Sequence, residues 1–188
     1  MLRIKNETTE MAKNIVFIGG IHGVGKSTVC QNICVKGDIK HLSASDLLKW
    51  VEINTDPKNK KVKDIEDTQQ RLLRGLNETV QMNTNYLLDG HFCLFNNHAE
   101  VSRIPISLFR SISPVMLCLV TGNVADIKNN IEQRDNRQYD LDLLTQMQVE
   151  EIQHATFIAS DLGIKLILGT KEDFKHIQES INAIFNLK

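Results

Sequence analysis

The chain has 188 residues, of which 41% are hydrophobic and 24% charged, and its formal net charge is -1. This length and composition are typical of a single soluble globular domain. The balanced charge argues against duplex nucleic acid as a partner, because proteins that bind it usually carry a strong basic excess.

Cysteine usage and apolar runs favour a cytoplasmic location without membrane contact. The four cysteines form no CxxC pair, so we expect reduced thiols in the core rather than zinc ligands. Cys30 and Cys34 lie four apart, on one face of a predicted helix. The purest apolar run, Val115–Val120, is far too short to span a bilayer, and the N-terminus lacks the apolar segment of a signal peptide.

Apolar runs alternate with amphipathic stretches along the chain. The runs predict strands at residues 14–19, 39–43, 86–90, 115–120 and 165–168. Helices are expected at residues 26–35, about 45–53, 64–82, about 123–133, 141–162 and 172–185, whereas residues 91–113 show no clear pattern. This order predicts an α/β fold with a five-stranded parallel sheet between two helical layers. Ligands should then bind at the carboxyl ends of the strands.

A phosphate-binding motif lies between the first predicted strand and helix. Residues Gly20–Ser27 match the pattern G-x-x-x-x-G-K-[ST], known as Walker A, whose glycines let successive backbone N–H groups point at an anion. The N-terminus of the following helix attracts the same negative charge. We therefore expect a site for ATP or GTP built from Gly20, His22, Gly23, Val24, Gly25, Lys26, Ser27 and Thr28.

We expect specific roles for four side chains in or near this loop. Lys26 would reach the β- and γ-phosphates, and the Ser27 hydroxyl would ligate Mg2+. Asp89 ends the third predicted strand, where an acid in P-loop folds usually holds Mg2+ through water; it could instead be a turn residue or helix cap. His91 could orient a water or contact an acceptor, or it could simply close the turn.

An arginine-containing turn, residues 134–140, joins two predicted helices after the fourth strand. Arg134 and Arg137 are three residues apart and could face one phosphate group together. Arginines supplied by a closing lid can stabilise charge on a transferred phosphoryl group. The alternative is a solvated helix end, with Arg134 near the helix dipole.

Together these segments resemble adenylate kinases, most closely the archaeal type. The resemblance rests on Gly19–Val29, Asp89-x-His91, Arg103–Pro105 and the spacing of Arg134 and Arg137, and it covers residues 14 to 185. It implies phosphoryl transfer from ATP to AMP with Mg2+, a sheet in the order 2-3-1-4-5, a short lid at about 134–140 and a homotrimer. Lys26 would then grip the transferred phosphoryl, Asp89 would organise Mg2+, and Arg134 and Arg137 would be lid arginines.

The same resemblance implies an acceptor-binding helical region at about residues 45–82 within the single domain 1–188. Ser45 and Asp46 would lie where this region begins, Lys49 would meet the acceptor phosphate, and His91 is a further candidate for acceptor binding. The chain lacks the arginine that commonly follows the strand-end acid in adenylate kinases. The sequence therefore predicts a nucleoside monophosphate kinase and keeps two alternatives, a small-metabolite kinase and an ATP-driven switch or assembly factor.

Overall fold

The computed structural model describes residues 14–35, 38–48, 65–96, 98 and 100–187. Five parallel strands form one sheet: β1 (Ile15–Gly19), β2 (Ile39–Ser43), β3 (Asn85–Asp89), β6 (Met116–Thr121) and β7 (Leu166–Thr170). They lie in the order β2-β3-β1-β6-β7, with β1 paired in parallel to β3 and β6. The first strand is thus central, and its carboxyl end opens directly into the phosphate loop.

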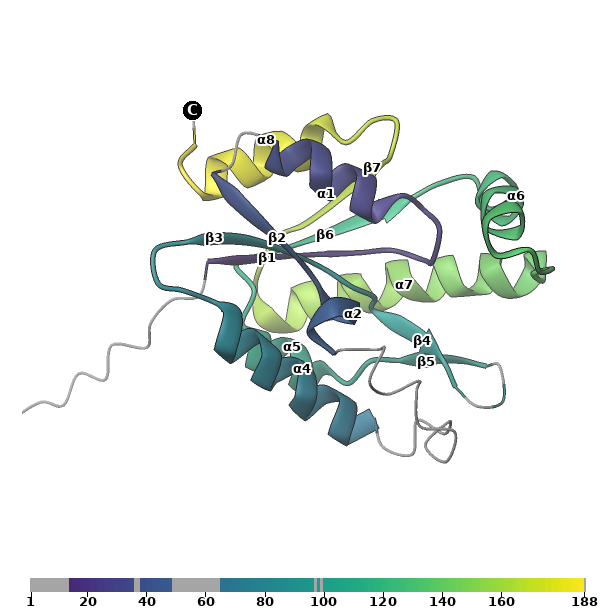
Figure 1. Ribbon diagram of the computed structural model, residues 1–188, viewed down its shortest axis with the longest axis horizontal. Coiled ribbons are helices and arrows are strands. Elements are labelled where there is room, and N and C mark those ends of the chain that lie inside the picture. The colour runs from purple at the N-terminus through teal and green to yellow at the C-terminus, as the bar shows by residue number, and fades with distance from the viewer. Residues whose placement is uncertain (1–13, 36–37, 49–64, 97, 99, 188) are drawn as a thin grey trace, which may run out of the picture.

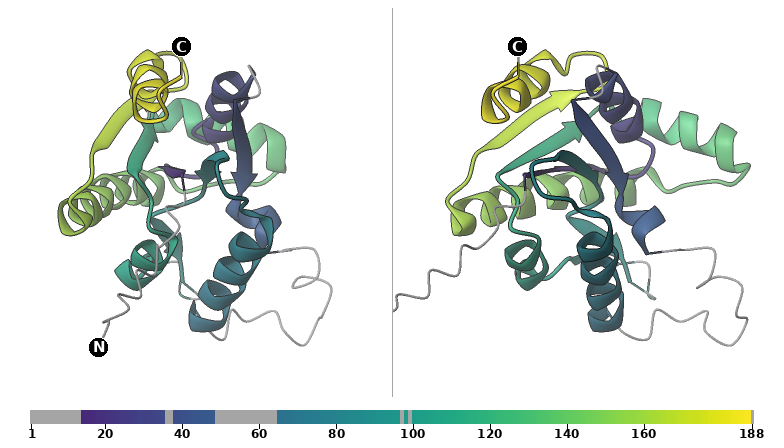
Figure 2. Two further views of the ribbon diagram at one scale, coloured as in Figure 1. Left: turned by 90° about the vertical axis from the view of Figure 1, so that its left-hand side faces the viewer. Right: turned by 60° about the vertical axis from the view of Figure 1, so that its left-hand side comes forward.

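Helices cover both faces of the sheet, as the sequence predicts (Figures 1 and 2). Helices α1 (Lys26–Cys34) and α8 (Lys175–Ile184) lie on one face, and α4 (Ile65–Thr79), α5 (Ile106–Ile112) and α7 (Leu141–Leu162) lie on the other. Two apolar clusters follow from this arrangement because successive strand residues point to opposite faces. Val16 and Leu87 belong to the cluster beneath α1, whereas Phe17 and Leu88 belong to the other.

Residues 91–113, for which the sequence predicts no element, contain a β-hairpin and a helix. Strands β4 (Cys93–Phe95) and β5 (Val101–Arg103) pair antiparallel in a separate two-stranded sheet, and α5 follows. These strands have three residues each, too few to show a clear alternation. The expected order 2-3-1-4-5 corresponds to the observed β2-β3-β1-β6-β7, and only the strand numbers differ, because two unpredicted strands come between the third and fourth strands of the main sheet.

The remaining elements differ from the expected bounds by a few residues. The long amphipathic helix ends at Thr79 rather than near position 82, and the chain then turns through Asn83, whose φ is 59°. Helix α6 (Val124–Asp135) is capped at its N-terminus by Asn123, whose side chain accepts bonds from two backbone N–H groups. Helix α2 (Ala44–Leu47) is short, and the predicted continuation to about residue 53 lies outside the described residues. In the described part of the chain, no helix is long and apolar enough to cross a membrane.

Candidate nucleotide-binding site

The Walker A segment forms a tight loop between β1 and α1, as the sequence predicts. Gly23 and Gly25 have φ angles of 80° and 99°, a region that side-chain-bearing residues rarely occupy. At Gly23 an added Cβ would lie 2.0 Å from Cγ2 of Ile131 on α6, so packing against that helix also demands glycine. The curled backbone ends at the N-terminus of α1, which makes the loop suited to an anion.

Lys26 is buried at the floor of this loop. Its Nζ donates to the carbonyl oxygens of Gly20 at 2.8 Å and Ile21 at 3.1 Å. Burial lowers the pKa of Lys26, while the charges of Glu151 and Asp89 act in the opposite direction. The ammonium group is therefore held inside the loop by its two carbonyl partners.

Asp89 lies at the carboxyl end of β3, where the sequence places it, and has a partner that the sequence did not indicate. Its Oδ2 atom lies 2.6 Å from Nε2 of His41 on the neighbouring strand β2. Asp89 and Ser27 both line the same cavity. A hydroxyl and a carboxylate are oxygen ligands of the kind that Mg2+ prefers, so these residues fit a magnesium ion.

A buried glutamate on α7 binds the backbone of the loop that follows β3. Glu151 is completely buried, and its Oε1 accepts bonds from the backbone N–H groups of Phe92 at 2.9 Å and Cys93 at 3.0 Å. Nδ1 of His91 lies 3.7 Å from the same oxygen. Among the described residues, Oε2 of Glu151 and Nδ1 of His91 have no hydrogen-bond partner.

The role of Glu151 was missed by sequence reasoning, although the sequence carries a signal. Leu144, Met147, Glu151, Ala155 and Ile158 follow each other at helical spacing, and all are buried. A glutamate on the apolar stripe of an amphipathic helix must have polar partners, because burying an unpaired carboxylate is costly.

The predicted arginine turn brings only one of its two arginines to the cavity. Arg134 lines the cavity, and its Nη2 contacts Nε2 of His22. The guanidinium of Arg137 instead lies 4.5 Å from the centroid of the Tyr139 ring, outside the cavity lining. The two arginines therefore do not line the cavity together in this structure, because α6 ends and Asn136, with a φ of 49°, redirects the chain between them.

Asp135 links the two ends of this turn through hydrogen bonds to Arg134 and Tyr139. It accepts bonds from Arg134 Nε and Tyr139 Oη, both at 2.6 Å. The hydrogen bonds from Arg134 and Tyr139 hold the pKa of Asp135 well below its usual range, and the bond to Asp135 raises the pKa of Arg134. Desolvation, followed by the charge of Arg134, lowers the pKa of His22. The turn therefore presents a fixed guanidinium beside a His22 ring that favours the neutral form.

One cavity of about 830 Å3 joins the phosphate loop to a second region bounded by α2, α4 and the β4–β5 hairpin. The walls of this second region are largely apolar, with Leu48, Leu72, Leu94, Phe95 and Leu108. Its polar lining residues are Ser45, Thr68, Gln69, Asn96, Ser102 and Arg103. A cavity of this size and composition is typical of small-molecule sites.

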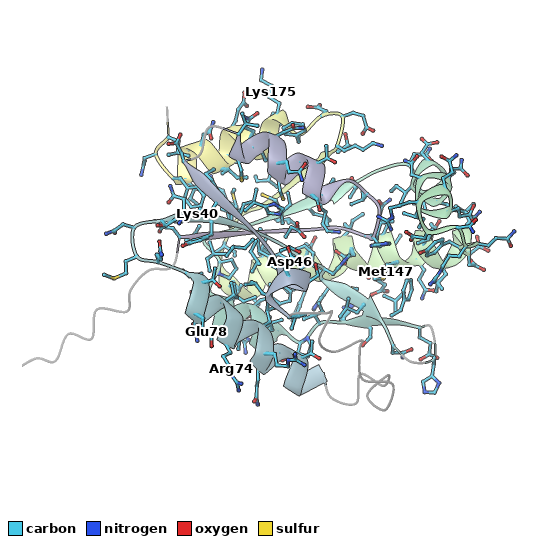
Figure 3. All side chains as sticks on the ribbon, in the orientation of Figure 1. Lys40, Asp46, Arg74, Glu78, Met147 and Lys175 are labelled. Atoms are coloured by element: carbon cyan, nitrogen blue, oxygen red, sulfur yellow. The ribbon has the colours of Figure 1, made fainter. Side chains whose placement is uncertain are left out.

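The residues predicted for acceptor binding fall into three groups. Ser45 and His91 line the cavity, whereas Asp46 on α2, labelled in Figure 3, is exposed and outside the lining. Lys49 lies outside the described residues. Arg103 lines the cavity from the hairpin, where Glu150 and Gln153 of α7 bind its Nε and Nη2.

Comparison with protein families places this geometry in a known group. A family model described as AAA domain matches residues 19–148, which is more than half of the chain. The matched segment begins at the end of β1, includes the whole phosphate loop and ends within α7. The chain belongs to this AAA domain family. In this AAA domain protein, the loop, Asp89 and Arg134 all fall inside the matched segment.

Two further comparisons concern individual proteins. The AAA domain chain is 32% identical to the adenylate kinase of Mycoplasma mobile over 90 residues, which are 43% of this chain and 41% of that protein. The match thus spans about two fifths of the relative. A gluconokinase from Sinorhizobium meliloti 1021 has a similar structure, with a TM-score of 0.57 over 93% of this chain and 94% of its own, at 11% identity. That likeness shows the fold.

Proposed function

We propose that the chain is a P-loop phosphotransferase that moves the γ-phosphoryl group of Mg-ATP to a small acceptor. The observation that carries the proposal is the single cavity in which the phosphate loop faces a second, differently lined region. Phosphoryl transfer needs two substrates in line and little covalent chemistry from the protein. A protein that only bound or hydrolysed ATP would not need the second region.

In this proposal the donor occupies the phosphate-loop half of the cavity. Backbone N–H groups around Gly23 and Gly25 would bind the β-phosphate, and Lys26 would leave its carbonyl partners to bind the transferred group. Ser27 and Asp89 would hold Mg2+, which neutralises charge on the phosphates during transfer. Arg134 lines the same half and would stabilise charge that develops in the transition state.

For the acceptor we propose a nucleoside monophosphate. The aliphatic and aromatic walls at Leu72 and Phe95 suit a planar base, and Gln69 and Asn96 offer hydrogen-bonding groups to its edge. Arg103 is a cation on this side of the cavity and can bind the acceptor phosphate through its remaining N–H groups. The partial likeness to an adenylate kinase supports the same acceptor class.

The second candidate is a kinase for a small metabolite hydroxyl. The solved structure that shares this fold is called a gluconokinase, and an arginine such as Arg103 can bind a sugar-acid carboxylate as well as a phosphate. The residues between the two halves of the cavity include Asp89 and His91, either of which could receive a hydroxyl proton.

The two candidates are separated by their products. The purified protein would be incubated with Mg-ATP and each of a panel of nucleoside monophosphates, sugar acids and polyols, with product identified by phosphorus NMR. We expect a nucleoside diphosphate from at least one monophosphate, and Lys26→Ala should abolish its formation. Phosphorylated sugar acid alone would replace the first candidate by the second. ATP hydrolysis without any phosphorylated acceptor would instead support an ATP-driven switch.

A further inference from the structure

Three side chains of different chemistry meet beneath α1, on the sheet face opposite α7. They are Cys30 of α1, His41 of β2 and Asp89 of β3, and one sulfur, nitrogen or oxygen atom of each lies within 4.8 Å of those of the other two. Cys30 is fully buried, and Asp89 is 8% exposed. The three residues are far apart in the sequence and are brought together only by the pairing of β2 with β3 and the packing of α1 on both strands.

We propose that Cys30, His41 and Asp89 form a binding site for a zinc-like divalent ion, and that this ion competes with the Mg2+–nucleotide complex. The competition rests on the proposed function, because it requires Asp89 to serve Mg2+. The metal site itself does not depend on that function.

The donor set decides the type of ion. Mg2+ requires oxygen ligands in a near-octahedral arrangement, so a sulfur and an imidazole nitrogen do not suit it. Zinc binds thiolate, imidazole and carboxylate together, and three protein ligands leave a fourth position for water or another small ligand. The mixed set of Cys30, His41 and Asp89 therefore favours zinc over magnesium.

The geometry needs only small movements of side chains. A tetrahedral zinc ion with ordinary bond lengths keeps its ligand atoms about 3.3–3.6 Å apart. Nε2 of His41 and Oδ2 of Asp89 are 2.6 Å apart and would separate as the ion replaces their hydrogen bond, while the Cys30 sulfur would move toward them. Shifts of about 1 Å bring all three atoms to bonding distance.

The charge of the site also fits a divalent ion. When the metal–sulfur bond forms, the Cys30 proton leaves to solvent, so that the thiolate and the Asp89 carboxylate balance the ion. Burial raises the pKa of the Cys30 thiol, so without an ion the sulfur keeps its proton. Lys26 acts electrostatically on both Cys30 and Asp89, and Glu151 opposes its charge. Entry of the ion therefore leaves the surrounding charges nearly balanced.

Competition follows from the position of Asp89. This carboxylate is the proposed Mg2+ ligand from β3, and in the zinc-bound protein it would be directed toward Cys30 and His41 instead. By linkage, an ion that weakens binding of the Mg2+–nucleotide complex must itself be bound more weakly in the presence of that complex.

The test uses cobalt as a spectroscopic substitute for zinc in the chelator-treated full-length protein. Cobalt bound to a thiolate gives a near-ultraviolet charge-transfer band, which identifies sulfur as a ligand without any activity measurement. We expect one equivalent of Co2+ to produce this band and one equivalent of Zn2+ to remove it. Cys30→Ser should lose the band, whereas Cys34→Ser, one turn further along the same helix, should keep it.

A second variant, His41→Gln, tests the same site if Cys30→Ser does not fold. His41→Gln changes a partly exposed side chain. Loss of a residue that only hydrogen-bonds a metal ligand weakens metal binding by about 10–100-fold. Because His41 is proposed to bind the metal directly, its replacement should weaken Co2+ binding by more than that. A band that survives Cys30→Ser in folded protein, or unchanged Co2+ affinity in His41→Gln, would overturn the metal site. Unchanged Co2+ affinity in saturating Mg-ATP would overturn the competition alone.

Discussion

Replacing Glu151 by leucine should destabilise the protein far more than the same change at the adjacent Glu150. The substitution leaves the N–H groups of Phe92 and Cys93 without their acceptor in a buried site. Each buried, unpaired N–H group costs about 1–3 kcal/mol, so the expected loss for the two is about 2–6 kcal/mol. Glu150 forms an ion pair with Arg103, which is nearly half exposed, and such pairs contribute about 0–1 kcal/mol.

The free energy of unfolding would be measured by urea titration of Glu151→Leu, Glu151→Gln and Glu150→Leu. Glu151→Gln keeps a side-chain oxygen as acceptor for the two N–H groups, so it should lie between the wild type and Glu151→Leu. If Glu151→Leu stays within about 1 kcal/mol of the wild type, the two backbone bonds do not anchor this loop as we infer.

Three further outcomes are expected. Gly23→Ala should abolish binding of Mg-ATP in calorimetry because the new Cβ would strike Ile131, whereas Gly163→Ala, also at positive φ but with nothing within 4 Å of the added Cβ, should bind normally. Arg134→Ala should lower kcat by about 100–1,000-fold, and Arg137→Ala by much less, in a coupled kinase assay; equal effects would contradict the geometry of the turn. Burial lowers the pKa of His154 below 6.5, so the folded state resists its protonation and stability should fall as pH drops through 6.5 toward 5. The free energy of unfolding of His154→Gln, measured by urea titration at pH 7 and pH 5, should fall less than that of the wild type. The same fall in both proteins would contradict this role of His154.

The sequence predicted the part of the molecule that depends on local pattern. Walker A glycines curl the backbone wherever a strand precedes them and a helix follows, so the phosphate loop could be recognised from eight residues. Continuous apolar runs likewise identified β1, β3 and β6, whose residues are almost all buried, because strands buried on both faces need them. Strands β4 and β5 were missed because three residues each carry too little periodicity.

Only the tertiary structure decided which distant side chains share an environment. His41 contacts Asp89 because β2 pairs with β3 in one particular register, and Glu151 contacts the loop after β3 because α7 crosses beneath it. Arg137 leaves the cavity because one left-handed residue, Asn136, follows α6. Such contacts depend on strand register and helix packing, which join residues across 48 to 59 positions of the chain. The local sequence around a residue can indicate that a buried polar group needs partners, as at Glu151, but it does not identify those partners.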